Sequence, residues 1–158
     1  MFIQFGHNDQ KANDPKRFTA PHTGYRRYLE KFVCESREKE AAPVVFSSIV
    51  RRNFNEFGTL IDTHGGYPMT MRMVANEMNV SFVDLQWETE QLVQHAGPEG
   101  SKAMFLWIAA GSSEKFPEGK QDITHLSEKG ATEIARLAVN ALRAMNHALS
   151  EYMIEQPD

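Results

Sequence analysis

The chain opens with the stretch MFIQFGHND, residues 1–9, in which an apolar run leads directly into polar residues. Phenylalanine and isoleucine favour a β-strand, whereas glycine, asparagine and aspartate favour the turn that ends one. Two further short apolar runs, Pro43–Val50 and Val80–Leu85, are bounded in the same way. We therefore predict three buried strands, of which Met1–Phe5 is the first. A weaker run, Ala103–Ile108, is compatible with either a strand or a helix.

Between and after these runs, apolar residues recur at the spacing of one helix face in residues 25–36, 67–78 and 131–149. Ser127 is a candidate N-cap for the last of these helices. Strands that alternate with helices predict an α/β fold with three layers, in which helices cover both faces of a parallel sheet. We expect residues 1–150 to belong to a single domain and residues 151–158 to form a tail.

Polar side chains follow two of the predicted strands at the point where each strand ends. Asn8 and Asp9 come after the first strand, and Arg51 and Arg52 come after the second. Open parallel sheets bind ligands at the carboxyl ends of their strands. The sequence therefore predicts that these four residues lie on one rim, which is the candidate active rim.

The composition excludes several classes of protein. The chain has 158 residues, of which 41% are hydrophobic and 24% charged, and this suits one compact domain. Its formal net charge is −4 and no lysine or arginine run stands out, so nucleic acid is not an expected partner. Cys34 is the only cysteine, which excludes an internal disulfide. No apolar stretch approaches the roughly 20 residues that span a bilayer, and the sequence assigns no cellular location.

The stretch DITH, residues 122–125, suggests a general base with its orienting acid. A carboxylate that accepts the Nδ1 proton of an imidazole fixes its tautomer and stabilises the imidazolium that forms during proton transfer. Two residues between Asp122 and His125, on a loop just before a helix, permit that contact. Taken alone, the spacing favours a helix-entry loop in which Asp122 is an alternative cap and His125 is solvated, because this short pattern is common.

The stretch GHND, residues 6–9, suggests a second catalytic element. The side-chain amide of Asn8 can donate a hydrogen bond to an oxyanion, and Gly6 would let the backbone approach a ligand closely. The alternative is an ordinary turn. A third stretch, DTHGGYP at residues 62–68, is either a loop that contacts substrate through His64 and Tyr67, or a cap and turn before a helix.

Taken together, these motifs resemble a known family. The order of FGHNDQK at residues 5–11, DP at 14–15, VRR at 50–52, DTHGGYP at 62–68, DITHLS at 122–127 and GA at 130–131 resembles the SGNH (GDSL) hydrolase superfamily. Within it, the pattern is similar to the rhamnogalacturonan acetylesterase-like branch. The resemblance extends from residue 1 to about residue 142, and the combination is far more specific than any single motif.

The resemblance implies an ester hydrolase that removes acetyl groups from pectic polysaccharide through a serine-bound acyl-enzyme, without metal or organic cofactor. It implies that His125 is the general base, that Asp122 orients it, and that Asn8 belongs to the oxyanion hole together with Gly6. Because such substrates are acidic, we expect Arg51 and Arg52 to bind galacturonate carboxylates; the alternative is an ion pair with Asp62 or Glu56. We assign weaker substrate contacts to His7, His64 and Tyr67.

The sequence departs from the family pattern at the amino end. The Gly-Asp-Ser block that bears the nucleophile has no counterpart here, and neither does the block whose glycine supplies a backbone oxyanion donor. Both precede the matching segment in the family, so we expect an amino-terminal part to be absent and the chain alone to have weak or no esterase activity. Neither Ser48 nor Ser112 has the context of a nucleophile. We also expect the strand Met1–Phe5 to lack a neighbour, and the chain to form a homo-oligomer or pair with such a segment.

Two other classes of function remain open on the sequence alone. One is a metal-dependent hydrolase whose ligands would be His7, Asp9, Asp122 and His125, although no compact metal motif such as HExxH is present. The other is an inactive carbohydrate-binding or structural remnant, which a serine-directed covalent probe would not label.

Overall fold

A three-stranded parallel sheet forms the centre of the chain in the computed structural model, which describes residues 1–154. The strands are β1 (Phe2–Ile3), β2 (Val44–Phe46) and β3 (Ser81–Val83), and β2 lies between the other two. All three predicted strands are present but shorter than their apolar runs. After β1 and β2 the chain continues outside regular strands towards the carboxyl rim and carries the polar residues of the candidate site, whereas β3 is followed directly by the N-cap Asp84 of a helix.

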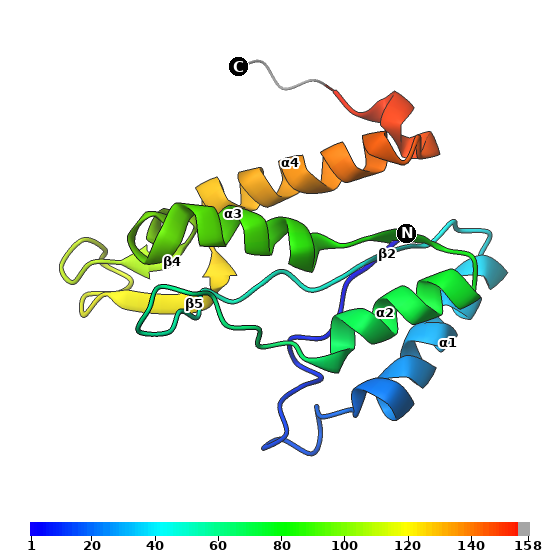
Figure 1. Ribbon diagram of the computed structural model, residues 1–158, viewed down its shortest axis with the longest axis horizontal. Helices are drawn as coiled ribbons and strands as arrows, with labels where there is room; N and C mark the ends of the chain where they lie inside the picture. The colour runs from blue at the N-terminus through cyan, green and yellow to red at the C-terminus, as the bar shows by residue number, and fades with distance from the viewer. Residues whose placement is uncertain (155–158) are drawn as a thin grey trace.

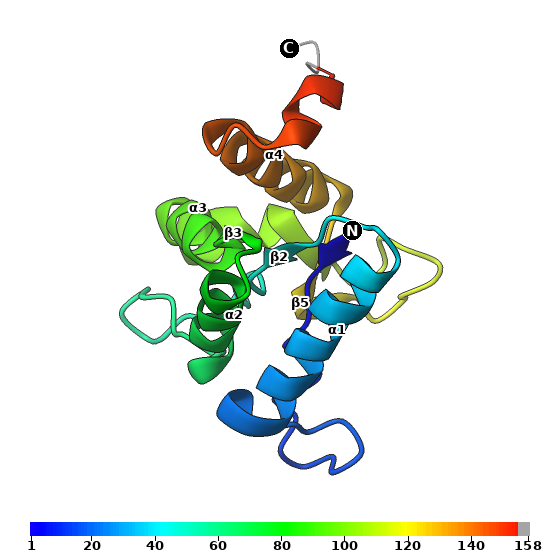
Figure 2. The same cartoon turned by 90° about the vertical axis from the view of Figure 1, so that its right-hand side faces the viewer.

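Helices cover both faces of this sheet, as the alternating pattern predicts. Figures 1 and 2 show α1 (Arg26–Glu38) and α2 (Gly66–Glu77) together on one side and α4 (Glu128–Ala144) on the other. Ile3 and Val45 pack towards α1 and α2, whereas Val44 and Phe46 pack towards α4. Because successive residues of a strand point to opposite faces, the central strand β2 contributes to two cores. The three-layer α/β/α fold is therefore confirmed.

The region after β3 differs from the prediction. A helix that the sequence pattern did not reveal, α3 (Leu85–Gly100), begins at the N-cap Asp84 and continues past a kink at Gly97 into the 3-10 helix η2 (Ser101–Met104). Its buried face consists of Leu85, Thr89 and Val93, a stripe that includes a polar residue and so escapes a search for apolar periodicity. The structure also resolves the ambiguous run at 103–108, which ends in a strand, β4 (Phe105–Ile108).

Strand β4 does not extend the parallel sheet. It pairs antiparallel with β5 (Lys120–Leu126), and the two form a separate hairpin-like ribbon beside α3. Val50 and Val93 join Met104 and Phe105 in a third core cluster, which holds this ribbon against the main domain. The ribbon therefore brings DITH to the side of the molecule to which the extended segment after β2 runs.

The last helix ends earlier than the sequence pattern predicts. Helix α4 begins after Ser127, whose hydroxyl accepts a hydrogen bond from the backbone of Gly130 at 3.1 Å, so the predicted N-cap is confirmed. It ends at Ala144 and is followed by the 3-10 helix η3 (Ala148–Tyr152). Met153 packs against the α4 cluster, so the predicted tail 151–158 begins within packed structure; residues 155–158 lie outside the described part.

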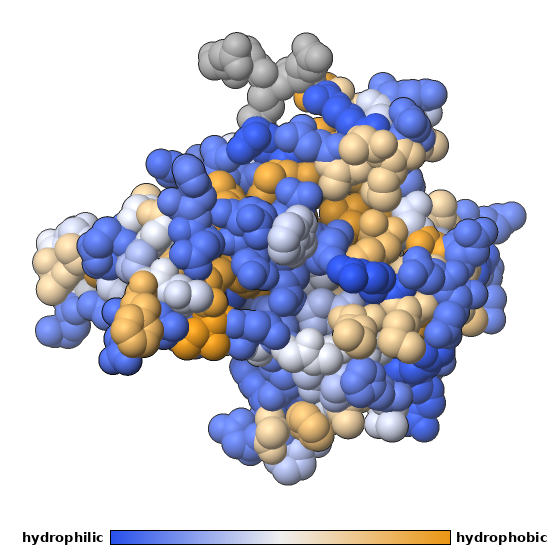
Figure 3. All heavy atoms as spheres, viewed as in Figure 1, coloured by the Kyte–Doolittle hydropathy of each residue, from blue (hydrophilic) through white to orange (hydrophobic). Residues whose placement is uncertain are grey.

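Strand β1 lies at the edge of the sheet, and its aromatic side chains are exposed to different degrees. Phe2 is 58% exposed and Phe5, just beyond the strand, is 43% exposed. Apolar residues also reach the surface beneath α4, as the space-filling view in Figure 3 shows. Self-association through this edge stays a prediction, which light scattering at micromolar concentration would test. No helix within residues 1–154 is long and apolar enough to cross a membrane.

Candidate active site

Asp122 and His125 form the predicted pair. Nδ1 of His125 lies 2.7 Å from Oδ2 of Asp122, which is hydrogen-bond distance. Oδ1 of the same carboxylate accepts the backbone N–H groups of Thr124 and His125, each at 2.8 Å. The side chain of Asp122 is only 13% exposed, whereas that of His125 is 74% exposed. The imidazole is thus held at one nitrogen by a recessed carboxylate while the ring remains accessible to a reactant.

The local backbone of this pair corrects the expectation of a plain loop. The pair lies within β5, but Trp107 is paired with Gln121 and Phe105 with Leu126, so that residues 122–125 lie opposite a single residue of β4. The extra residues form a bulge, a device that re-aims side chains next to active sites. The bulge allows Asp122 to cap its own downstream backbone inside a strand.

The carboxyl group of Asp122 is ionised at neutral and mildly acidic pH, because its pKa is lowered. Burial by itself would raise its pKa, but the hydrogen bonds from the backbone of His125 and Thr124, from the His125 ring and from Lys120 outweigh that effect. Together they hold the pKa of Asp122 well below its usual range. A permanently ionised partner is what an imidazole needs if it is to accept a proton during a reaction.

Gly6 and Asn8 lie in the turn that follows β1, and the structure separates their roles. The N–H of Gly6 donates to Oδ2 of Asp9 at 3.0 Å, so this amide is already occupied and the expectation that Gly6 serves as an oxyanion donor is not supported. Gly6 has a φ of +126°, and a Cβ at this position would lie 2.6 Å from Oγ of Ser48. Glycine is therefore required for the turn itself. Asn8 is exposed, with no side-chain hydrogen bond to another described residue.

His7 and His64 form a pair of recessed imidazoles behind this turn. Their ring centroids are 4.7 Å apart in an edge-to-face arrangement. Burial, followed by the neighbouring charges of His64, Arg51 and His125, lowers the pKa of His7 to about 4. Burial also lowers the pKa of His64, whose Nε2 lies 2.7 Å from the carbonyl oxygen of Ile49. Both rings are therefore neutral near pH 7.

The two arginines occupy different environments. Arg52 is 8% exposed; its Nε donates to Oγ of Ser101 at 3.0 Å and its guanidinium stacks over the ring of Trp107, 4.5 Å from the centroid. A guanidinium so enclosed is not available to a substrate carboxylate, which argues against the predicted role of Arg52. Arg51 is half-buried and donates to the carbonyl oxygen of His7 at 3.2 Å and to Oγ1 of Thr63 at 3.2 Å. Neither arginine forms the alternative ion pair with Asp62 or Glu56 within residues 1–154.

The stretch 62–68 supports its own and neighbouring loops, and its side chains His64 and Tyr67 are not positioned to contact a substrate. Asp62 caps its own loop by accepting the backbone N–H of His64 at 2.7 Å and of Gly65 at 3.1 Å. His64 is 2% exposed and Tyr67 is 6% exposed, so direct substrate contacts by these two side chains are not supported. The hydroxyl of Tyr67 lies 3.0 Å from the carbonyl oxygen of Asp9 and 2.9 Å from that of Thr19, and it holds the far side of the Asn8 turn.

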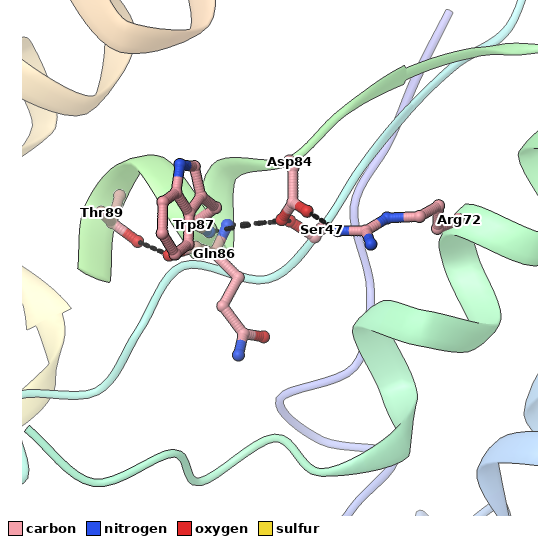
Figure 4. Close-up of polar contacts among 6 residues, drawn as sticks. All are labelled: Ser47, Arg72, Asp84, Gln86, Trp87 and Thr89. Atoms are coloured by element: carbon pink, nitrogen blue, oxygen red, sulfur yellow. Dashed lines mark hydrogen bonds and ion pairs between the residues drawn. The ribbon is translucent and has the colours of Figure 1, made fainter. Parts of the chain in front are cut away.

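The serines near the rim are committed to structural contacts. Ser48 is fully buried and donates to the carbonyl oxygen of Phe5 at 2.8 Å. Ser112 is exposed and donates to that of Ala109 at 2.7 Å. Ser47 donates to Oδ1 of Asp84 at 2.9 Å and accepts the backbone N–H of Gln86 at 2.8 Å, in the polar cluster of Figure 4. This cluster, which the sequence analysis missed, joins the end of β2 to the start of α3; the N-cap position of Asp84 was its only local signal.

The metal-site alternative is not favoured by the arrangement. Within the part of the chain that the structure describes, no three His, Cys, Asp or Glu side chains converge as metal ligands. His7 faces His64, Asp9 accepts from Gly6 and Thr19, and Asp122 is occupied by its own bulge. The four residues proposed as ligands are therefore engaged in separate contacts.

Comparison with solved structures identifies proteins of the same fold. The fold is similar to that of the protein YXIM of Bacillus subtilis, with a TM-score of 0.73 and 20% identity over 93% of this chain and 37% of that one. It is also similar to a catalytic mutant of the acetylxylan esterase Axe2 of Geobacillus stearothermophilus, with a TM-score of 0.61 and 18% identity over 98% of this chain and 61% of that one. The chain therefore shares its fold with these two proteins. No family model matches the sequence.

Comparison of amino-acid sequences identifies the family of the chain. The chain is 38% identical over 156 residues to the rhamnogalacturonan acetylesterase RhgT of Bacillus subtilis, and 31% identical over 156 residues to the probable rhamnogalacturonan acetylesterase YesY of the same organism. Both matches include 99% of this chain. It belongs to the rhamnogalacturonan acetylesterase family, and it spans 66% and 67% of the length of these two relatives.

Proposed function

We propose that this chain supplies the general base, its orienting acid and one oxyanion donor of a carbohydrate acetylesterase. The observation that carries the proposal is the 2.7 Å contact between His125 Nδ1 and Asp122 Oδ2, combined with the open face of the imidazole. Such a pair can remove a proton from a nucleophile and return it to a leaving group.

In the proposed reaction, Nε2 of His125 takes the proton of a serine hydroxyl as its oxygen attacks the acetyl carbonyl. The side-chain amide of Asn8 donates to the oxyanion that forms, and Asp122 stabilises the imidazolium. The protonated imidazole then gives its proton to the departing sugar oxygen as the carbon–oxygen bond breaks, so that the sugar leaves with a free hydroxyl group. Water resolves the acetyl-enzyme by the same steps and releases acetate.

The serine of this scheme is proposed to lie in a Gly-Asp-Ser segment outside the sequence of this chain. Two observations support that part of the proposal: Ser48 is buried with its hydroxyl engaged, and Ser112 lies on the exposed loop after β4. The names of the relatives, which are rhamnogalacturonan acetylesterases, favour acetylated pectic polysaccharide as the substrate class.

Two proteins, the chain alone and a chimera, test the proposal together. The chain alone should hydrolyse 4-nitrophenyl acetate weakly or not at all, and a fluorophosphonate probe should not label it. A chimera that adds the part of RhgT outside the match should be labelled and should release acetate from acetylated rhamnogalacturonan. His125→Ala in the chimera should lower kcat by on the order of a thousandfold or more, with Arg136→Gln on the exposed face of α4 as the matched control.

Three results would count against the proposal. Efficient hydrolysis by the chain alone that His125→Ala abolishes would require a nucleophile within it, and Ser48 and Ser112 would be the first to replace. Hydrolysis by the chimera that is insensitive to His125→Ala would remove the histidine from the mechanism. A correctly folded chimera without labelling or turnover would favour the inactive remnant.

A further inference from the structure

The segment Ser47–Arg52, which follows β2, contacts a different element at almost every residue. Two of its residues are anchored on α3. Ser47 binds Asp84 and Gln86 at the start of the helix (Figure 4), and the backbone N–H of Val50 donates to Oγ1 of Thr89 at 3.1 Å. Its middle touches the Asn8 side through Ser48 and the His64 loop through the Ile49 carbonyl. The segment therefore runs between the two halves of the candidate site.

Arg51 reaches both loops on one side of this segment. Its Nη2 donates to the carbonyl oxygen of His7, the residue before Asn8, and its Nη1 donates to the hydroxyl and to the carbonyl oxygen of Thr63, at 3.2 and 3.4 Å. With its amide oxygen facing Arg51, Gln10 accepts from both terminal nitrogens, at 2.9 and 3.0 Å. A single planar guanidinium thus ties the turn that carries Asn8 to the loop that carries Thr63.

The neighbouring residue makes the connection to the general base. The backbone N–H of Arg52 donates to the carbonyl oxygen of Ile123 at 2.8 Å, inside the bulge that holds Asp122 and His125. The Arg52 side chain is fixed at the same time by Ser101 and by the carbonyl oxygen of Pro98. Arg51 contacts the Asn8 turn and the next residue, Arg52, contacts the Asp122–His125 bulge. Among the described residues, no hydrogen bond runs directly from the turn to the bulge, so these two consecutive residues connect them.

We propose that Arg51 is a positioning residue, which sets the place of the Asn8 amide relative to His125 and does not itself bind substrate. Every acceptor that surrounds its guanidinium is neutral, and within residues 1–154 it forms no ion pair. Its terminal N–H groups donate to the turn that carries Asn8 and to the loop that carries Thr63 at the same time. Lysine cannot reproduce this arrangement, because an ammonium is a point donor on a flexible stem while the guanidinium fork has fixed, coplanar directions.

The positioning role of Arg51 is independent of the proposed function. Only the expected effect of Arg51 on the reaction rate rests on the proposed function. Hydrogen exchange and NMR on the chain as it stands therefore form the first test. The backbone N–H groups of Gln10 and Lys11 donate to the carbonyl oxygens of Gly6 and Asn8 and report on the turn. In both Arg51→Gln and Arg51→Lys, exchange at these two amides should accelerate at least tenfold and the side-chain amide signals of Asn8 should shift.

Selectivity separates positioning from general loss of stability. The Nδ1–H signal of His125 should persist in both variants, because its partner Asp122 is held within the bulge, and exchange in α1 and α2 should change far less than in the turn. Thr63→Val, which removes one hydroxyl acceptor and keeps the side-chain shape, should give a smaller change of the same kind. Arg136→Gln, at an exposed ion pair with Glu133, should give none.

Several outcomes overturn the proposal. One is that exchange at Gln10 and Lys11 is unchanged in both variants. Another is that Arg51→Lys exchanges at these amides as slowly as the original chain. A third is that exchange accelerates evenly over the whole chain. A saturable shift of the Arg51 Nε–H signal on addition of galacturonate would make Arg51 a substrate ligand instead. In the chimera, Arg51→Lys should lower kcat about tenfold with KM unchanged. If the chimera proves inactive while the exchange pattern is as expected, the proposed function fails and the positioning role stands.

Discussion

The Asp122–His125 bulge and the Asn8 turn contribute to the same candidate site but are built in opposite ways. In the bulge, the carboxylate of Asp122 binds two backbone amides and one ring within three residues of itself. In the turn, the decisive contacts come from Arg51 and Tyr67, which are far away in the sequence. The first half of the site is therefore self-sufficient, whereas the geometry of the second half depends on how distant elements pack.

The largest effect is expected where the turn meets the core. Gly6→Ala places a methyl group against Ser48 at a φ of +126° and should lower the free energy of unfolding by about 3 kcal/mol, since both backbone strain and overpacking contribute. Gly111→Ala is the matched control: its φ is +76°, but no atom lies within 4 Å of the added carbon, so about 1 kcal/mol is expected. Equal losses in urea titrations would contradict the role given to Ser48.

Removing one distant support should have the next largest effect. Tyr67→Phe deletes a buried hydroxyl beside the carbonyl oxygens of Asp9 and Thr19, and should cost about 1–2 kcal/mol because these acceptors lose a donor. Tyr28→Phe, at an exposed position of α1, should change stability by less than about 0.5 kcal/mol. If Tyr67→Phe leaves both stability and exchange at Lys11 unaltered, the turn does not depend on this support.

The self-sufficient half has its own signature in pH dependence. The pKa of Asp122 is lower in the folded chain than its value of about 3.9 in unfolded chains, so its stabilising contribution is present above about pH 4 and is lost as pH falls further. Asp122→Asn should accordingly be less stable than the original chain at pH 7, and the difference should shrink towards pH 3. Glu35→Gln, at an exposed helical ion pair, should show a much smaller difference. A constant gap from pH 7 to pH 3 would contradict this assignment.

The smallest effect is expected from the charged side chain of Lys120, which lies just before the bulge in the same strand. Nζ of Lys120 lies 3.2 Å from Oδ2 of Asp122, but its side chain is 35% exposed and the carboxylate keeps its other three donors. Lys120→Met should therefore change the free energy of unfolding by no more than about 0.5 kcal/mol. A loss as large as that of Asp122→Asn would mean that the bulge is not self-sufficient.

The same contrast explains which parts of the candidate site sequence reasoning could reach. The contact between Asp122 and His125 was predictable from the order of the motifs, although the β-bulge that brings the two side chains together within a strand was not. The roles of the arginines were not, because the position after a strand says where Arg51 and Arg52 begin but not which acceptors their long side chains meet. Arg52 is enclosed by Trp107, in the run that the sequence left open between strand and helix, and by Ser101, in the 3-10 helix η2 that precedes it.

The sequence by itself determined the three-layer fold, the Asp122–His125 contact and membership of a family, because periodicity, short spacing and motif order are all properties of a linear chain. Only the tertiary structure decided that Gly6 is needed for space and not as a donor, that His64 and Tyr67 are buried supports, and that Arg51 bridges two loops. These outcomes depend on which surfaces face each other when helices and strands pack, and a hydrogen bond between distant residues exists only once that packing has formed.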